Sequence, residues 1–368
     1  MIGRKVQKDR LHGVFARKEA IGLNAILLVN TNSEDPNFVY MTDFTSGIFE
    51  SSMLLLERRN GTVTLFTSPL EYGTAMAQKP KGMTVVNVDS KTKLDLLKRK
   101  ISGKAIGINA DFLPYGYYLR IKKRYAPKKL TSVSDAFTAV RLVKSDAEIA
   151  RIRKGSTITK KAIEIARKSL REGMTEKELA AIFENAIRTL GADGTAFSTI
   201  VCFGKNAALP HHMPDNTKLK YGDFVLMDVG AKVDNYCSDV TRTFLFGSDR
   251  KTIPDYDKKM AVISTVKEAQ SLAIKSIKEG VLANKPHMVA QEHIERANGG
   301  IYKGKFTHAL GHSVGIEVHD GPGLWPGAKF RLKAGTVTSV EPGIYIEGFG
   351  GARIEDDVVV TKNGAAIL

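Results

Sequence analysis

Two consecutive apolar segments each contain an aspartate where an unpaired charge would be costly. Asp228 interrupts the run Phe224–Val229, and Asp239 follows a turn at residues 233–235. A buried carboxylate costs several kcal/mol unless a cation compensates it, so two such acids on paired strands suggest half of a metal site. An ion pair with Arg242, or a carboxylate that caps a turn, would explain the pattern equally well.

Three of the eight histidines fall within twelve residues further along the chain. They are His308, His312 and His319, in a segment punctuated by glycines. A single histidine is more often a structural residue than a ligand. Three together, where glycines let the backbone approach closely, indicate a site.

Two glutamates near the C-terminus lie beside β-branched runs. Glu341 directly precedes Pro342, and Glu355 follows the segment that holds Arg353. Asp357 shares a strand face with Glu355 by the two-residue period, so spacing alone leaves either acid as a ligand.

The ordered set Asp228, Asp239, His312, Glu341 and Glu355 resembles the five-ligand site of the pita-bread metallopeptidases. That family contains methionine aminopeptidase, aminopeptidase P and prolidase. The surrounding sequences match as well: MDVGAKVDNYCSDVTRTF, GHSVGIEVHD, VEPGIYI and GARIEDDVVV. The resemblance implies that Asp239 and Glu355 bridge two ions, that Asp228 binds one of them, and that His312 and Glu341 bind the other. It also implies a metal-bridging hydroxide as nucleophile, with Glu341 as proton shuttle to the leaving nitrogen.

Further histidines resemble substrate-contacting groups of the family. His211, in the segment AALPHH, occupies the matching position in preference to His212, although a structural role in which His211 only pairs with a carbonyl stays open. His308 and His319 match two more such groups, and the resemblance implies that His319 stabilises the tetrahedral intermediate.

Two more residues complete the site that the resemblance implies. Tyr345 and Arg353 match groups that orient the carboxylates. The predicted substrate-binding set is His211, His308, His319, Tyr345 and Arg353, and the predicted catalytic set is Glu341, His211 and His319.

The ligand types also predict the metal. Four carboxylates and one imidazole favour hard or borderline ions, so we expect two divalent ions per subunit, Mn²⁺ or Co²⁺ ahead of Zn²⁺ or Fe²⁺. The two cysteines, Cys202 and Cys237, form no CxxC zinc pair, and we expect two buried thiols.

The elements that position these residues predict an α+β fold in two domains. Alternating helices and short strands, with a hairpin at Asn60-Gly61, indicate an N-terminal α/β domain over 1–134 that resembles the creatinase/prolidase N-terminal type. A linker over 135–144 and a pita-bread metallopeptidase domain over 145–368 follow. Capping boxes at Ser145 and Thr175 predict the starts of two helices.

The charge is unevenly distributed between these parts. The whole chain carries +16; residues 1–144 hold 24 Lys and Arg against 12 Asp and Glu. Such a surface is a solvated face or attracts anionic partners, but no nucleic-acid motif accompanies it, so we expect no nucleic-acid partner. No apolar run reaches the roughly 18 residues of a membrane span and no secretory signal is seen, so we expect a cytoplasmic protein that does not contact membranes.

The N-terminal domain favours the proline-specific branch of the family, because methionine aminopeptidases lack it. We therefore expect hydrolysis of the Xaa-Pro bond of dipeptides or short peptides, by a homodimer. Several dipeptidases of the family carry an arginine just beyond the position of His319; here residues 320–324 contain none, and Lys329 or Arg331 would have to replace it. Dipeptidase and aminopeptidase both stay open. Methionine-aminopeptidase-like specificity, and a non-catalytic pita-bread protein that binds partners through its basic N-terminal domain, are the alternatives.

Overall fold

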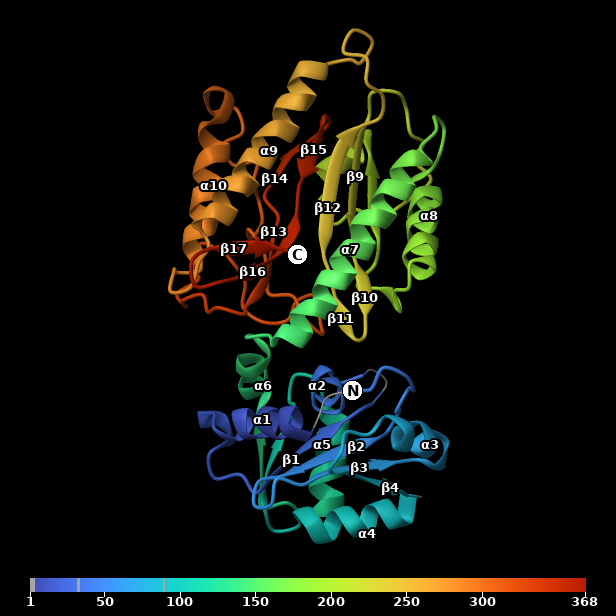
Figure 1. Cartoon of the computed structure of the whole chain (residues 1–368), viewed down its shortest axis with the longest axis vertical. Coiled ribbons are helices and arrows are strands. Elements are labelled where there is room, and N and C mark those ends of the chain that lie inside the picture. Colours follow the sequence, from blue (N-terminus) through green and yellow to red (C-terminus); the bar gives the residue numbers. More distant parts are fainter. Residues whose placement is uncertain (1–3, 32–33, 89) are drawn as a thin grey trace. The chain divides into compact units, whose positions relative to one another are not determined.

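The computed structural model describes residues 4–31, 34–88 and 90–368. The chain forms two compact units, Met1–Arg141 and Leu142–Leu368, and each is described separately (Figure 1). We call them the first and the second unit.

A mixed six-stranded sheet is the centre of the first unit. The central strand β1 (Ala25–Val29) is buried along its whole length, and it pairs antiparallel with β2 (Met53–Glu57) and parallel with β5 (Ala105–Ile108). The strand order is β4-β3-β2-β1-β5-β6, with β3 at Val63–Thr67, β4 at Met83–Asn87 and β6 at Lys129–Ser132. The predicted hairpin joins β2 to β3, and Gly61 adopts the positive φ of +64° that its turn requires.

The helices of the first unit lie around this sheet (Figure 1). They are α1 (Arg4–Phe15), α2 (Pro36–Thr42), α3 (Pro69–Gln78), α4 (Ser90–Ile101), α5 (Tyr115–Tyr125) and α6 (Ser134–Arg141), with a 3₁₀ turn η1 at Lys18–Ala20. The predicted linker over 135–144 is therefore mostly helix α6. Helix α6 packs against the rest of the first unit. Phe137 is fully buried, and Arg141 donates a 2.9 Å hydrogen bond to Asn37 Oδ1 of the same unit.

Four long helices surround the strands of the second unit. Helices α7 (Asp146–Lys168) and α8 (Glu176–Thr189) begin at the two predicted capping boxes. In each box a glutamate accepts a hydrogen bond from the backbone N–H of the cap residue, 2.8 Å at Ser145 and 2.9 Å at Thr175. The other two are α9 (Tyr256–Ser276) and α10 (Asn284–Arg296), and the 3₁₀ turns are η2 (Gly204–Ala208) and η3 (Ala297–Gly300).

The strands of this unit form four small sheets. In one, β9 (Phe224–Val229) lies between β8 (Ile200–Phe203) and β12 (Val240–Leu245), and Asp228 is opposite Thr241. The other strands are β7 (Gly194–Thr195), β10 (Ala231–Val233), β11 (Tyr236–Cys237), β13 (Val337–Val340), β14 (Gly343–Ile346), β15 (Gly350–Arg353), β16 (Asp356–Val360) and β17 (Ala365–Ile367).

Strand β9 separates two hydrophobic cores. Val225 and Met227 join the core beneath α7 and α8, whereas Phe224 and Leu226 join the core beneath α9 and α10. Because strand side chains alternate between faces, Asp228 lies on the face of Phe224 and Leu226. Figure 1 shows the two helix pairs on opposite sides of these strands.

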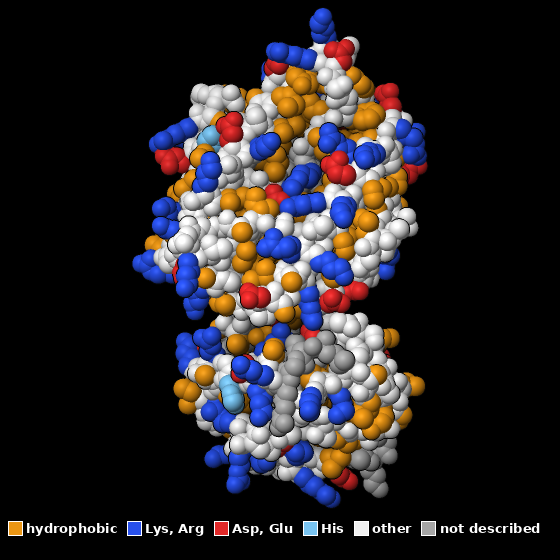
Figure 2. Space-filling view, viewed as in Figure 1, with side chains coloured by type: hydrophobic (Ala, Val, Ile, Leu, Met, Phe, Trp, Pro, Cys, Tyr) orange, Lys and Arg blue, Asp and Glu red, His pale blue; other side chains and the backbone are white. Residues whose placement is uncertain are grey.

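The surface of both units carries many basic side chains. Figure 2 shows Lys and Arg spread over the visible face of the first unit, not gathered into one stripe. In the described part of the chain, no helix combines the length and apolar character that crossing a membrane demands.

Candidate metal centre

Most of the predicted ligands lie in short breaks between strands and not within a strand. Asp228 lies within β9, but Asp239 follows β11 and precedes β12, and Glu355 lies between β15 and β16. Asp239 was expected within a continuous strand. The strand breaks there because the Asp239 amide donates a 2.9 Å hydrogen bond to Oδ2 of Asp357 in place of a ladder partner.

The backbone around His312 pairs with β13, which brings His312 beside Glu341. The Ser339 amide donates to the His312 carbonyl at 2.8 Å, and the Glu341 amide donates to the Leu310 carbonyl at 2.8 Å. This approach requires a glycine at position 311, where a Cβ atom would lie 2.1 Å from the Ser339 carbonyl oxygen.

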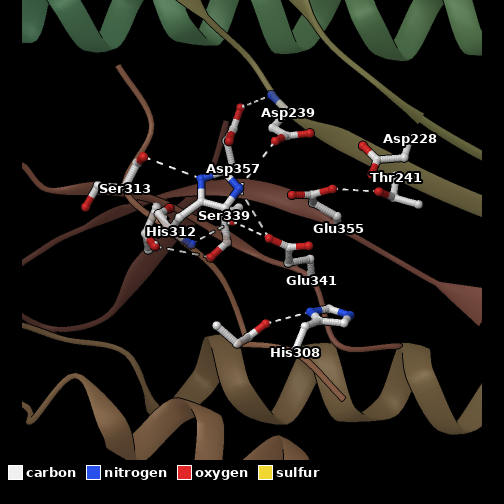
Figure 3. Close-up of polar contacts among 12 residues, drawn as sticks. Asp228, Asp239, Thr241, His308, His312, Ser313, Ser339, Glu341, Glu355 and Asp357 are labelled. Carbon is white, nitrogen blue, oxygen red and sulfur yellow. Dashed lines mark hydrogen bonds and ion pairs between the residues drawn. The ribbon is translucent and has the colours of Figure 1, made fainter. Parts of the chain in front are cut away.

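The five predicted ligands converge at one place (Figure 3). His312 Nε2 lies 3.3 Å from Glu341 Oε1 and 3.5 Å from Asp239 Oδ2. One ligand atom from each of Asp239, His312 and Glu355 lies within 4.8 Å of the other two. Asp228 lines one cavity together with Asp239, His312 and Glu341. Side chains from four separate stretches of chain therefore surround one small volume.

Two oxygens of this cluster have no protein partner. Among the described residues, neither Asp239 Oδ1 nor Glu355 Oε1 has a hydrogen-bond donor, although both atoms are buried. A buried carboxylate oxygen without a donor is costly unless a cation meets it. With the oxygen-rich donor set, these orphaned atoms fit divalent ions.

Proton binding in the cluster reflects the same crowding of negative charge. Burial, followed by repulsion from neighbouring carboxylates, raises the pKa of Asp239 and of Glu355 well above the usual range. Burial also opposes ionisation of Glu341, but its hydrogen bond and ion pair with His312 outweigh that effect and lower its pKa to about 2.

His312 is oriented by its second ring nitrogen. Its Nδ1 lies 3.4 Å from the Ser313 carbonyl, which leaves Nε2 facing the acids. Burial works against its protonation, but the contact with Glu341 prevails and raises its pKa.

Arg353 connects Asp228 to Tyr345 and His308, two of the predicted substrate-binding residues. Its guanidinium contacts the Asp228 carboxylate and donates a 2.7 Å hydrogen bond to the Tyr345 hydroxyl, which lies 2.8 Å from His308 Nε2. His308 Nδ1 lies 2.8 Å from the Ala309 carbonyl, so Nδ1 carries the proton and Nε2 accepts from Tyr345. Arg242, the alternative partner of a buried aspartate, instead pairs with Asp356 at 2.8 Å.

A cavity of about 410 Å³ opens onto the cluster. His211, His308 and His319 all line it, whereas the adjacent His212 contacts Glu176 at 2.8 Å. The His319 ring stands nearly perpendicular to that of His312, with centroids 4.1 Å apart. The apolar part of the wall consists of Phe197, Ile200, Pro210, Ala309 and Val318.

The two basic residues considered as substitutes for an arginine do not reach this cavity. Arg331 donates a 2.7 Å hydrogen bond to the Gly280 carbonyl, and Lys329 is exposed. Neither lines the cavity wall.

Several hydrogen bonds that support the cluster were not predicted from the sequence. Thr241 donates a 2.6 Å hydrogen bond to Glu355 Oε2, and Ser339 donates to Glu341 Oε1 at 3.1 Å. Asp357 Oδ2 accepts from Ser156 at 3.0 Å as well as from the Asp239 amide. Asp357 was visible in the sequence as an alternative to Glu355, and Thr241 shares a strand face with the Asp239 position. The others depend on contacts between distant segments.

Two family models match the chain over nearly its whole length. Metallopeptidase family M24 matches residues 150–362, and the Creatinase/Prolidase N-terminal domain matches residues 10–143. The two matches follow the division into a first and a second unit.

Individual relatives cover both units. The Xaa-Pro dipeptidase of Pyrococcus horikoshii is 36% identical over 99% of this chain and 97% of its own length. The prolidase structure from P. horikoshii OT3 covers 98% of this chain and 97% of its own at 32% identity, with a TM-score of 0.86. The X-Pro aminopeptidase structure from Thermotoga maritima covers 94% and 95% at 34% identity, with a TM-score of 0.85. The predicted fold class, an N-terminal α/β domain followed by a pita-bread domain, is confirmed.

Proposed function

The chain belongs to metallopeptidase family M24, and we propose that it hydrolyses the peptide bond before a proline in dipeptides and short peptides. The observation that carries this proposal is the convergence of Asp228, Asp239, His312, Glu341 and Glu355 beneath one cavity. In the described part of the chain, two buried oxygens there have no donor, which supports a site for cations.

We propose that the site holds two divalent ions, Mn²⁺ or Co²⁺ ahead of Zn²⁺ or Fe²⁺. Asp239 and Glu355 would contact both ions, Asp228 one, and His312 with Glu341 the other. When bound, such a pair lowers the pKa of water and polarises the scissile carbonyl. The oxygen-rich donor set and the Nε2 of His312 that faces the acids support this assignment.

The chain's own side chains then handle protons and substrate. Burial opposes ionisation of Glu341, but the contact with His312 prevails and lowers its pKa, so its carboxylate is ionised. Because Glu341 also lines the cavity, it would take up a proton from the nucleophile and pass it to the leaving nitrogen. His319 and His211 line the cavity and would meet the substrate carbonyl and backbone. The Tyr345 hydroxyl fixes His308, so that ring presents a defined edge to the substrate.

Two observations support proline specificity: the names of the relatives, and the first unit, which matches the Creatinase/Prolidase N-terminal domain. Relatives named for Xaa-Pro dipeptidase and X-Pro aminopeptidase activities resemble this chain to a similar degree. Proline lacks an N–H and bends the chain, so a peptidase that binds extended strands handles it poorly and a dedicated site is needed. Both dipeptides and short peptides therefore belong to the proposed substrate class.

One panel of peptides tests this function. Pure protein loaded with Mn²⁺ or Co²⁺ is incubated with Ala-Pro, Gly-Pro-Gly and a Met-Ala peptide. We expect metal-dependent cleavage before proline and no cleavage of the Met-Ala peptide. Cleavage of Met-Ala alone would establish methionine-aminopeptidase-like specificity, and no cleavage of any peptide would favour a binding protein.

We also propose that the protein is a cytoplasmic homodimer. This follows the resemblance to the family and is tested by light scattering of the pure protein, where a monomeric mass would contradict it.

A further inference from the structure

A second cluster of polar side chains lies outside the proposed ligand set. Glu176, the first residue of α8, is fully buried, and its carboxylate lies 2.8 Å from His212 Nε2. We propose that Glu176 and His212 are positioning residues that hold the neighbouring His211 at the cavity wall. This inference rests on the proposed function, in which His211 contacts the substrate.

The Glu176 carboxylate is occupied on both oxygens. Oε1 accepts from the Phe203 amide at 2.7 Å and from Asn206 Nδ2 at 2.9 Å. Oε2 accepts from His212 Nε2 at 2.8 Å and from the Asp215 amide at 3.0 Å. Four N–H donors offset the cost of burying this charge, and the start of α8 favours an anion. Glu176 therefore binds the loop over residues 203–215 at four points.

The same cluster could suggest a metal site, because ligand atoms of Glu176, His212 and Asp215 lie within 4.8 Å of one another. The hydrogen bonds argue otherwise. A cation at Glu176 would have to displace the Phe203 and Asp215 amides, which donate to its two oxygens, whereas the proposed metal centre has buried oxygens that no donor of the described residues meets. The hydrogen bonds instead fit a clamp, by which we mean that Glu176 holds the loop over residues 203–215 through its four hydrogen bonds.

His211 depends on such a clamp. Its side chain has no hydrogen bond to any other residue within the described ranges, so the place of its ring at the cavity depends on how its backbone is held. On one side, the Pro210 carbonyl lies 3.5 Å from Arg353 Nη2. On the other side, His212 is held by Glu176. His211 thus lines the cavity, and the adjacent His212 fixes the loop.

A double-mutant cycle separates positioning from a general effect on the fold. We expect His212→Ala to lower kcat/KM about 10- to 100-fold, the loss that a shift of about 1 Å causes at an active site. If His212 acts through His211, the same substitution in a His211→Ala background lowers kcat/KM less than about twofold. Equal losses in both backgrounds would overturn the proposal.

Conservative and control variants sharpen the cycle. His212→Gln retains an N–H near the Nε2 position and is expected to restore most activity, whereas Glu176→Gln replaces an acceptor oxygen with a donor and is expected to resemble His212→Ala. His293→Ala removes a matched histidine that lies 3.2 Å from Glu268 on the α9–α10 pair, and it should change nothing. A His212→Gln variant as impaired as His212→Ala would contradict the clamp.

Hydrogen exchange of the unloaded full-length protein gives a readout that needs no substrate. We expect His212→Ala to speed exchange of the amides over 203–217, and His293→Ala to leave them unchanged. Unchanged exchange in His212→Ala would overturn the positioning role even if that variant has lost activity. The kinetic cycle uses whichever peptide wild type cleaves fastest, so a failure of proline specificity leaves this test intact.

Discussion

The backbone amide of Asp239 donates a 2.9 Å hydrogen bond to Oδ2 of Asp357, a residue 118 positions later in the chain. The same oxygen accepts from Ser156. Oδ2 of Asp357 thus holds the Asp239 backbone, whereas a carboxylate oxygen of Glu355 lies within 4.8 Å of ligand atoms of both Asp239 and His312. Among the described residues, each of these two acids also has one buried oxygen without a donor, so that property does not distinguish them. The structure separates two acids that strand spacing alone left equivalent.

Glu355→Gln and Asp357→Asn should therefore differ. We expect Glu355→Gln to lose one metal and essentially all activity, because it removes a charge proposed to contact both ions. Asp357→Asn should weaken metal affinity about 10- to 100-fold but regain activity at high metal concentration. Metal content by mass spectrometry, with activity titrated against Mn²⁺, measures both. A reversed order would make Asp357 the ligand.

Asp239→Asn and His319→Ala should separate metal binding from turnover. Asp239→Asn is expected to abolish activity and lower metal content. His319→Ala should keep both metals and reduce kcat about 100-fold or more, as loss of a donor to a developing oxyanion does. A His319→Ala enzyme with wild-type turnover would remove the role proposed for that residue.

Tyr345→Phe tests the hydrogen bonds that fix His308. Burial raises the pKa of Tyr345 to about 12, so the hydroxyl stays protonated and donates to His308 while it accepts from Arg353. Without it, we expect kcat/KM to fall about 10-fold at unchanged metal content. Tyr236→Phe is the matched control, because that buried hydroxyl donates to Glu148 away from the cavity. Equal losses in both variants would indicate a nonspecific effect.

Metal binding should strengthen as the pH rises. Burial raises the pKa of Asp239 and Glu355, and contact with Glu341 raises that of His312, so the unloaded protein retains protons that an ion must displace. Raising the pH removes those protons beforehand, so apparent affinity increases and fewer protons are released per ion. Calorimetry in buffers of different ionisation enthalpy measures both quantities. A pH-independent affinity between about pH 5.5 and about 8 would contradict these pKa directions.

Local patterns in the sequence predicted much of the fold. Strand β9 has the predicted bounds, and the helices after Ser145 and Thr175 begin where the capping boxes place them. These features depend on residues near one another in sequence. The helix over 134–141 was missed because it is only eight residues long, and its apolar side chains find partners only within the folded unit.

The arrangement of the site was harder to predict. The five ligand types and their order were visible, but the strand break at Asp239 depends on Asp357, which spacing cannot reveal. Glu176 was read only as part of a capping sequence, although its buried carboxylate binds a loop nearly thirty residues away. Such contacts form only when distant segments pack together.

Anomalous scattering from crystals soaked in Mn²⁺ shows directly whether two ions occupy the cluster. We expect two peaks beneath the cavity, both in contact with Asp239 and Glu355, with His312 and Glu341 at one of them. A map with no anomalous density among these side chains, from protein that still cleaves peptides, would contradict it.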